Sequence, residues 1–268
     1  MERNIALKLM YNGTAYHGWQ VQPNGITVQQ VLQDAVERLT GVRSGLTGCS
    51  RTDAGVHANM FCCTLDTACP LRGDKLAAAL NAHLPADVAV YGCREVAADF
   101  HPRYMAAGKR YVYRIWNAPA RNPFWQGYAL HRQRRLDERR MNEAAADYLG
   151  THDFTAFCSA GSAVEDRVRI VRHCRVSREG DLVTFVVEAD GFLYNMVRIM
   201  IGTLLDMASG RIPWDALPAI LLSRDRNRAG ATAPACGLYL DEVFYPDDAV
   251  RDALAPPVRG GTGGRYGE

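Results

Sequence analysis

A chain of 268 residues with 48% hydrophobic and 22% charged side chains can bury a large core as one long domain or as two tandem ones. No run reaches about 18 consecutive apolar residues, so we expect a globular protein without a membrane span. The net charge of +2 and the isoelectric point near 8.1 are too mild to indicate or exclude a nucleic-acid partner. No signal peptide is expected, because the polar start is followed by alternating apolar residues.

The first half of the chain shows alternating strand and helix patterns. Apolar residues alternate over 5–11, as in a half-buried strand, whereas the glycine-rich and aromatic stretch 11–24 has no period and is expected to be a loop. Thr27 and Gln30 have capping-box spacing ahead of an amphipathic helix that Gly41 ends. Further on, the pattern predicts a strand over 60–65, a helix over 73–83 and a strand over 88–96.

The second half begins a similar round. The expected elements are strands over 109–116, 169–176, 182–189 and 238–245, and helices over 136–149, 192–208 and 214–222. The longest of these helices is strongly apolar and carries one narrow stripe at spacings of three and four, formed by Asn195, Arg198 and Gly202. The proline-rich and glycine-rich tail, 247–268, is expected to be flexible.

Two rounds of strands and helices favour an α+β fold. Sequential strands are close enough in the chain to pair, so the helices are expected to pack on one face of a mainly antiparallel sheet. We expect an N-terminal α+β half over residues 1–105 and a C-terminal α+β half over residues 106–246.

Cysteine and histidine spacing gives no sign of a metal. The eight cysteines contain no C-x-x-C pair, and the seven histidines are scattered. We therefore expect small buried thiols in a reducing, cytoplasmic protein, with no metal and no cofactor. Arginines cluster within 132–140, 167–178 and 224–228. The clusters are typical of a surface that binds nucleic-acid phosphates. They could equally result from a G+C-rich genome, which favours arginine and alanine codons.

Residues 47–58 place one carboxylate among small residues and groups that can carry positive charge. Arg51 lies two residues before Asp53, and His57 lies four after it. A cation within about 4 to 6 Å would keep the carboxylate ionised and in place, which makes Asp53 a candidate nucleophile or base. Gly55 permits backbone angles that would let a planar substrate approach the main chain. The alternative is a tight turn in which Asp53 only caps its own backbone.

The stretch 51–58 reads Arg-Thr-Asp-Ala-Gly-Val-His-Ala, and five other stretches accompany it. They are 11–20, 99–103, 109–111, 191–198 and 232–240. In these stretches, and in their order, the chain resembles the tRNA pseudouridine synthase A family over roughly residues 5–246. One departure is Tyr194-Asn195, where some relatives have a histidine pair.

The resemblance implies a fold and an activity. The fold would consist of two tandem ferredoxin-like halves that join into one sheet with a central cleft, in a homodimer without a cofactor. The activity would be that of an isomerase that converts uridine to pseudouridine at positions 38 to 40 in the anticodon stem-loop of tRNA. Asp53 would be the essential group, whether it attacks the uracil ring, attacks ribose C1′ or abstracts a proton.

The resemblance also implies substrate contacts. Tyr111 matches an active-site tyrosine whose ring could stack on uracil, and Arg198 matches the basic partner of the catalytic aspartate. Arg51 is similar to a residue that helps to extrude the target base from its stack. His57, in the same octapeptide, completes the expected substrate-binding set.

Two other functions stay open at the level of sequence. A tRNA-binding protein or folding helper could keep this scaffold without turnover, although the presence of Asp53, Tyr111 and Arg198 together argues against it. A glycoside or peptide hydrolase could use an Asp-Ala-Gly loop, but it would need a second carboxylate near the first. No second copy of the motif occurs in the chain.

Overall fold

The computed structural model describes residues 2–246, and the tail that was expected to be flexible lies outside them. The N-terminal half consists of β1 (Arg3–Tyr11), α1 (Val28–Thr40), β2 (Leu46–Gly48), β3 (His57–Thr67), α2 (Gly73–Asn81) and β4 (Val88–Glu95). β1 pairs with β4 on one side and β3 on the other, and β2 pairs with β3, all antiparallel. The order β4-β1-β3-β2, with α1 and α2 as connections, is that of a ferredoxin-like unit.

The C-terminal half repeats this order. It consists of β5 (Gly108–Trp116), β6 (Leu130–His131), α3 (Glu138–Ala145), β7 (Gly150–Asp153), β8 (Val168–Glu179), β9 (Leu182–Ala189), α4 (Met196–Ala208), α5 (Leu217–Ser223) and β10 (Leu238–Phe244). The order β10-β5-β9-β8 is antiparallel throughout, with α3 between β5 and β8 and α4 between β9 and β10. The two ferredoxin-like halves expected from the resemblance are confirmed.

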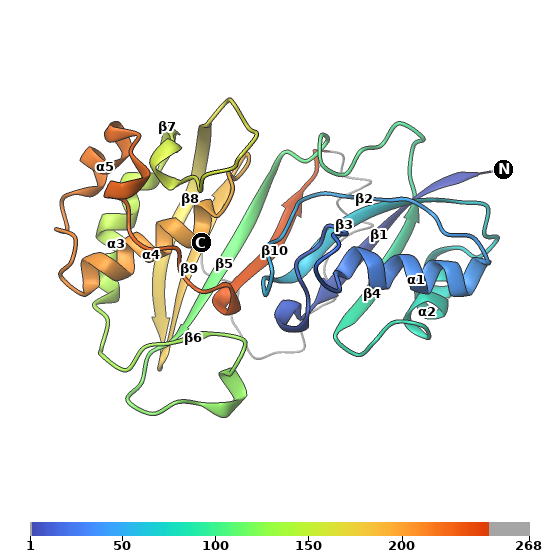
Figure 1. The fold of residues 1–268 in the computed structure, drawn as a ribbon, viewed down its shortest axis with the longest axis horizontal. Helices are drawn as coiled ribbons and strands as arrows, with labels where there is room; N and C mark the ends of the chain where they lie inside the picture. The colour runs from blue at the N-terminus through green and yellow to red at the C-terminus, as the bar shows by residue number, and fades with distance from the viewer. Residues whose placement is uncertain (1, 247–268) are drawn as a thin grey trace.

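A single strand joins the two halves into one 10-stranded sheet. β10, the last strand among residues 2–246, lies between β3 and β5 (Figure 1). It runs antiparallel to β5 but parallel to β3, where Tyr239 is opposite His57 and Leu240 is opposite Ala58. β3 therefore pairs with β2 towards its far end and with β10 at its start, and the expected joined, mainly antiparallel sheet is confirmed.

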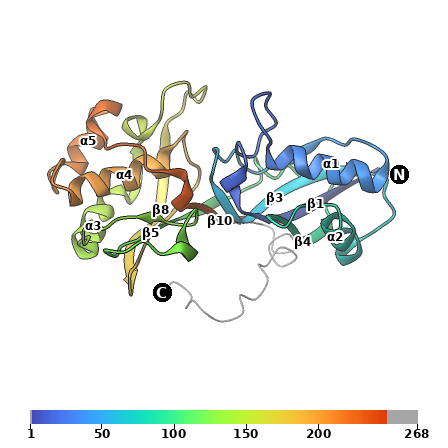
Figure 2. The same cartoon turned by 60° about the horizontal axis from the view of Figure 1, so that its bottom comes forward.

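The helices pack on one face of the sheet, and the main hydrophobic core lies between them and the strands (Figures 1 and 2). Leu32 of α1 and Leu80 of α2 are fully buried with Leu7 of β1 in the N-terminal half. Met200 of α4 and Phe185 of β9 are fully buried in the C-terminal half. Because side chains alternate along a strand, the reverse face carries a smaller buried cluster of Val112, Val186 and Tyr239.

Local signals explain where the elements begin and end. The Thr27 hydroxyl accepts a hydrogen bond from the Gln30 amide at 3.3 Å, and Gly41 ends α1 with a left-handed φ of 74°. α4 begins at Met196, later than predicted, because Asn195 has a φ of 61°. The strands β2, β6 and β7 were not predicted, since two to four residues show no detectable period. Within residues 2–246, every helix is too short or too polar to cross a bilayer.

Candidate active site

The loop 49–56 follows β2 and leads into β3, and the aromatic segment ahead of α1 holds it in place. The Thr52 carbonyl accepts a hydrogen bond from the Trp19 amide at 3.1 Å, and the Thr52 and Tyr11 hydroxyls lie 2.8 Å apart. A Cβ on Gly18 would stand 2.3 Å from the Thr52 carbonyl oxygen, so glycine is required for this approach. The aromatic segment therefore positions the loop as well as covering the core.

A tight turn is present in this loop, but it uses the main chain of Asp53. The Val56 amide donates to the Asp53 carbonyl oxygen at 3.1 Å, and Gly55 allows the turn with a φ of 77°. The side chain of Asp53 lines a cavity between the two halves. The turn interpretation of the sequence therefore describes the backbone and does not account for the carboxylate.

The carboxylate of Asp53 meets a cation from the other half of the chain. Its Oδ2 lies 3.4 Å from Nη1 of Arg198 in α4, and the two side chains are 30% and 18% exposed. Burial raises the pKa of Asp53 above its ordinary value of 3.8, and the charge of Arg198 opposes this rise. A poorly hydrated carboxylate that still has a cationic partner is a stronger base and nucleophile than a surface aspartate.

Two further contacts fix the guanidinium of Arg198. Its Nε donates to the Ala233 carbonyl oxygen at 2.7 Å, and its Nη1 donates to the Asn195 side-chain oxygen at 2.8 Å. The segment around Ala233 lies directly against α4, because Gly202 leaves room for it. A Cβ on Gly202 would stand 1.7 Å from the Ala231 carbonyl oxygen. The narrow stripe predicted on this helix is therefore the surface that positions the ion pair.

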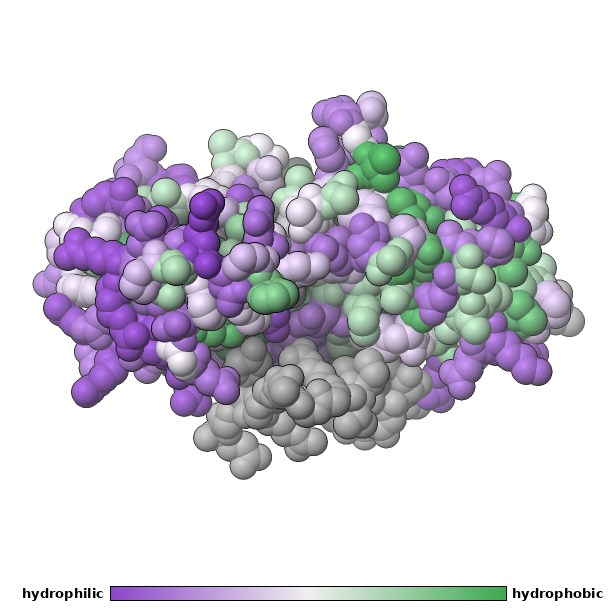
Figure 3. Space-filling model, turned by 90° about the horizontal axis from the view of Figure 1, so that it is seen from below, coloured by the Kyte–Doolittle hydropathy of each residue, from purple (hydrophilic) through white to green (hydrophobic). Residues whose placement is uncertain are grey.

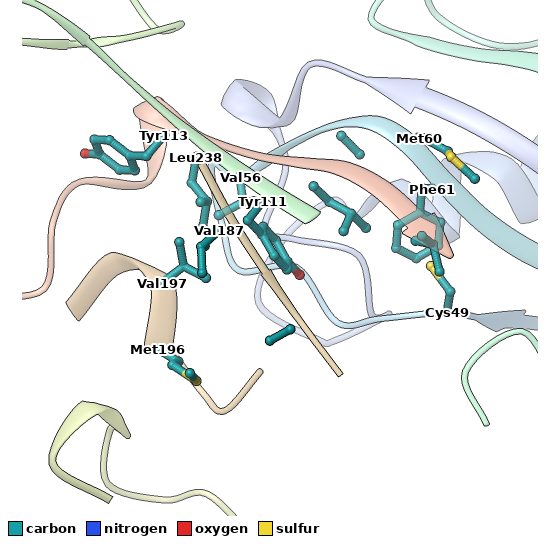
Figure 4. Close-up of a cluster of buried hydrophobic side chains, with 14 of the residues drawn as sticks. Cys49, Val56, Met60, Phe61, Tyr111, Tyr113, Val187, Met196, Val197 and Leu238 are labelled. Carbon is teal, nitrogen blue, oxygen red and sulfur yellow. The ribbon is translucent and has the colours of Figure 1, made fainter. Parts of the chain in front are cut away.

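Tyr111 forms an aromatic wall of the same site. Figure 4 shows its ring beside Val187 of β9 and close to Val56 of the loop. The ring packs edge-on against Phe192 with the centroids 4.9 Å apart, and the hydroxyl lies 3.4 Å from Ser50 Oγ. Burial raises the pKa of Tyr111, so its hydroxyl stays protonated at neutral pH.

A cavity of about 490 Å³ between the two halves brings these groups together, which confirms the expected central cleft. Its lining consists of Ser50, Arg51, Thr52, Asp53, Val56, Arg103, Lys109, Tyr111, 161–164, 192–198 and Leu238. Asp53 is the one carboxylate among these described residues, and it shares the lining with four cations, of which Arg198 is its ion-pair partner. Across residues 2–246, no group of three or more His, Cys, Asp or Glu side chains is arranged to hold a metal ion.

His57 lies away from Asp53, in contrast to the expectation from their spacing. It is the first residue of β3, and its ring stacks on Tyr239 on the reverse face of the sheet, with the centroids 4.6 Å apart. Its Nδ1 accepts from the Gly13 amide at 3.1 Å, and its Nε2 lies 3.2 Å from the Cys236 carbonyl oxygen. Burial lowers the pKa of His57, so the ring is neutral at pH 7. The cation that pairs with Asp53 comes instead from α4.

The other cations of the cavity come from both halves. Arg51 lines it with an exposed side chain that forms no ion pair among the described residues. Arg103 and Lys109 also line it, although neither was predicted to belong to the site. Lys109 is two residues from Tyr111 on β5, so the period of two along a strand could have indicated that both side chains face the site.

The arginine clusters lie mainly on the surface of the C-terminal half. Arg132, Arg135 and Arg139 are exposed, whereas Arg178 is held by Glu138 at 2.8 Å. Seen from below, the molecule is more hydrophilic over the C-terminal half than over the N-terminal half (Figure 3). The clusters thus contribute charge to the surface, with Arg178 serving a structural ion pair.

Known proteins resemble this chain over most of its length. The family described as tRNA pseudouridine synthase matches residues 8–105 and 144–246. The tRNA pseudouridine synthase A of Acetivibrio thermocellus is 46% identical over 243 residues, which are 91% of this chain and 100% of that protein. The tRNA pseudouridine synthase A of Thermoanaerobacter sp. strain X514 is 43% identical over 243 residues, again 91% of this chain and 100% of that protein.

A more distant similarity exists to a chain in the crystal structure of a Cbf5-Nop10-Gar1 complex. The TM-score is 0.35 and the identity 14%, over 90% of this chain and 59% of that one. The family match, by contrast, includes both partners of the ion pair in the cavity, Asp53 and Arg198. With that match, and with relatives aligned over 91% of its length, the chain belongs to the tRNA pseudouridine synthase family.

Proposed function

We propose that this chain converts uridine to pseudouridine in the anticodon stem-loop of tRNA, at positions 38 to 40 as the family resemblance implies. The observation that carries the proposal is the carboxylate of Asp53, paired with Arg198 at 3.4 Å in a cavity otherwise lined by cations, aromatic rings and neutral side chains. An aromatic wall suits a uracil base, and the cations suit RNA phosphates. The halves 1–105 and 106–246 act as the two walls of this cavity.

The reaction needs no redox change and no outside energy source. The bond between ribose C1′ and uracil N1 breaks, the base turns, and C1′ joins C5, which gives up its hydrogen as a proton while N1 takes one up. Asp53 starts this sequence as a nucleophile on the base or on C1′, or as the base that removes a proton. Each route needs an ionised oxygen, and Arg198 holds that charge through Oδ2, which leaves Oδ1 to face the substrate.

Tyr111 and Arg51 handle the base in this proposal. The Tyr111 ring is the stacking partner of uracil. Its hydroxyl, which is protonated at neutral pH, can pass a proton on to Ser50 Oγ at 3.4 Å while its oxygen takes up the proton that leaves C5. Arg51, exposed at the cavity wall, helps to hold the target nucleotide out of its stack. His57 lies outside this cavity, with its ring stacked on Tyr239 at the reverse face of the sheet, and its contact with the substrate stays a prediction.

The alternatives are less well supported by the cavity. A hydrolase with paired carboxylates would need a second acid beside Asp53, and the described lining contains none. A protein that only binds tRNA would not need a partly buried carboxylate whose pKa is raised and whose partner Arg198 is fixed by two further hydrogen bonds.

Tritium release tests the proposed activity. Unmodified tRNA that carries 5-³H-uridine loses tritium to water only if a new bond forms at C5. We expect the native chain to release one tritium for each pseudouridine formed, with the modified position mapped within the anticodon stem-loop. Tight binding of several unmodified tRNAs without any release would instead support the binding protein.

We further propose that the protein works in the cytoplasm as a homodimer. The support is the resemblance to the family and a substrate, tRNA, that is used in that compartment. Light scattering of the purified chain at micromolar concentration should give twice the mass of 29.6 kDa. The mass of a monomer under these conditions would contradict the homodimer and leave the proposed activity untouched.

Gly202→Ala should damage activity from a distance, because the new Cβ would stand 1.7 Å from the Ala231 carbonyl oxygen. The displaced segment would carry the Ala233 carbonyl away from Arg198. We expect a loss of about 1–3 kcal/mol in the free energy of unfolding and roughly a tenfold to hundredfold drop in kcat. Denaturant unfolding and tritium release measure the two effects. Gly45→Ala, where a Cβ meets open space, is the control and should change neither.

A further inference from the structure

Lys109 is a cation of the cavity that has no acidic partner. Its Nζ donates to Ser50 Oγ at 3.4 Å, and among residues 2–246 no carboxylate lies within ion-pair distance of it. Burial and the nearby charge of Arg103 lower the pKa of Lys109. A partly buried ammonium group with a like charge beside it is unfavourable until an anion joins it.

Arg103 supplies the second charge of the same wall. Its side chain is exposed and forms no ion pair among the described residues. The turn that carries it is held by the His101 ring, whose Nδ1 accepts a hydrogen bond from the Arg103 amide at 3.2 Å. Two cations therefore converge on one part of the cavity from separate segments, the turn around 101–103 and the strand β5.

The position of Lys109 and Arg103 relative to Asp53 and Tyr111 restricts which anion can bind between them. Arg198 already has Asp53 as its partner, so the charge of Lys109 is not needed to balance the carboxylate. Ser50, which Lys109 contacts, also lies 3.4 Å from the Tyr111 hydroxyl. A nucleotide whose base stacks on Tyr111 carries its own phosphates into this part of the cavity.

We propose that Lys109 and Arg103 form a subsite for one of the two phosphates that flank the target uridine. This inference rests on the proposed function and names the part of the substrate that these two residues recognise. The subsite anchors the backbone of the extruded nucleotide while Asp53 and Tyr111 act on its ribose and base. An anchored phosphate lets the base turn without releasing the strand, which the isomerisation requires.

A different role for Lys109 would be a proton relay through Ser50 to the Tyr111 hydroxyl. The two roles differ in what they depend on. A phosphate contact changes RNA affinity and vanishes when that phosphate loses its charge, whereas a relay changes the rate of the chemical step and is indifferent to the charge of the RNA backbone.

Synthetic anticodon stem-loops separate these roles. Three RNAs are compared: one with all phosphates intact, and two in which a neutral methylphosphonate replaces either the 5′ or the 3′ phosphate of the target uridine. All three carry 2′-O-methyl groups on the nucleotides whose 2′ oxygen would attack a methylphosphonate. Affinity is measured by fluorescence anisotropy, and turnover by release of tritium from C5.

The protein variants are Lys109→Gln, Arg103→Gln and, as the matched control, Lys75→Gln, which changes an exposed lysine of α2. For the native chain, one of the two methylphosphonates should weaken binding by about tenfold to a hundredfold, the scale of a hydrogen-bonded ion pair. Lys109→Gln should weaken binding of the intact RNA by a similar factor and then show almost no further penalty from that methylphosphonate. Lys75→Gln should retain the full native penalty.

The outcomes separate the subsite from the proposed function. Equal methylphosphonate penalties in the native chain, Lys109→Gln and Arg103→Gln overturn the subsite, while tritium release by the native chain keeps the isomerase. A Lys109→Gln variant with native affinity and reduced turnover on every RNA also overturns the subsite and supports the relay. If Lys109→Gln fails to fold, Arg103→Gln decides, because Arg103 is exposed. A native chain that neither binds nor turns over the intact stem-loop overturns both proposals.

Discussion

Asp53→Asn is expected to lower pseudouridine formation by about a thousandfold or more while tRNA binding is retained. Asparagine keeps the shape of the side chain but cannot attack a carbon or remove a proton, and each proposed route begins with one of these steps. Single-turnover tritium release measures the rate, and a filter-binding assay measures the affinity. Asp34→Asn is the matched control, because Asp34 is a half-buried carboxylate of α1 that pairs with Arg43 at 2.8 Å outside the cavity, and it should leave both unchanged.

The same variant should keep or slightly raise the stability of the fold. Burial raises the pKa of Asp53 in the folded chain, so the folded state binds that proton more tightly than the unfolded state does. Ionisation of this carboxyl at neutral pH therefore weakens the fold, and a neutral asparagine removes that cost. An Asp53→Asn variant that keeps more than a tenth of the native rate, or that loses activity only because it unfolds, would contradict the role assigned to the carboxylate.

Arg198→Met is expected to reduce kcat/KM by about a hundredfold, because it leaves a partly buried carboxylate without its cation. It should also shift the acidic limb of the pH–rate profile. In the native chain the limb should already lie above 3.8, since burial raises the pKa of Asp53. Arg198 opposes that rise, so its removal raises the pKa further and activity is lost at a higher pH on acidification. Rates measured between pH 4 and pH 8 on one tRNA test both effects.

Arg198→Lys distinguishes charge from geometry. Lysine restores a positive charge near Asp53, so the acidic limb should return towards its native position. An ammonium group cannot reproduce the guanidinium contacts with the Ala233 carbonyl and the Asn195 side chain, so the rate should recover only in part. An acidic limb that stays in place in Arg198→Met, or moves to lower pH, would show that Arg198 does not set the charge of Asp53.

Much of the fold could be predicted because its signals are local. Thr27, Gln30 and Gly41 determine both ends of α1, and the alternation of Tyr111, Tyr113 and Ile115 indicates which face of β5 is buried. The signals fail where an element is too short to show a period, as in β2. The start of α4 was predicted too early because the apolar pattern already includes Phe192 and Leu193, while the left-handed backbone of Asn195 is invisible in that pattern.

The site was less accessible from the sequence, because its parts are far apart in the chain. Asp53 could be singled out from its neighbours, but its partner Arg198 is 145 residues away and was indicated only by resemblance. His57 was expected near Asp53 from a spacing of four, which brings side chains together on a helix but not across a loop and the start of a strand. Lys109 could have been found from its place on β5, yet its lack of an acidic partner is visible only in three dimensions.

The position of β10 also determines when, during synthesis of the chain, the sheet and the cavity can be completed. All partners of β1 lie in the first 95 residues, so the N-terminal sheet can form early, whereas the start of β3, which β2 does not reach, gains its second neighbour only from residues 238–244. Until that strand leaves the ribosome, the start of β3 is an open edge and Asp53 lacks the opposing wall. A nascent chain can therefore neither bind its substrate productively nor hide this edge, and it is here that chaperone binding or aggregation would begin.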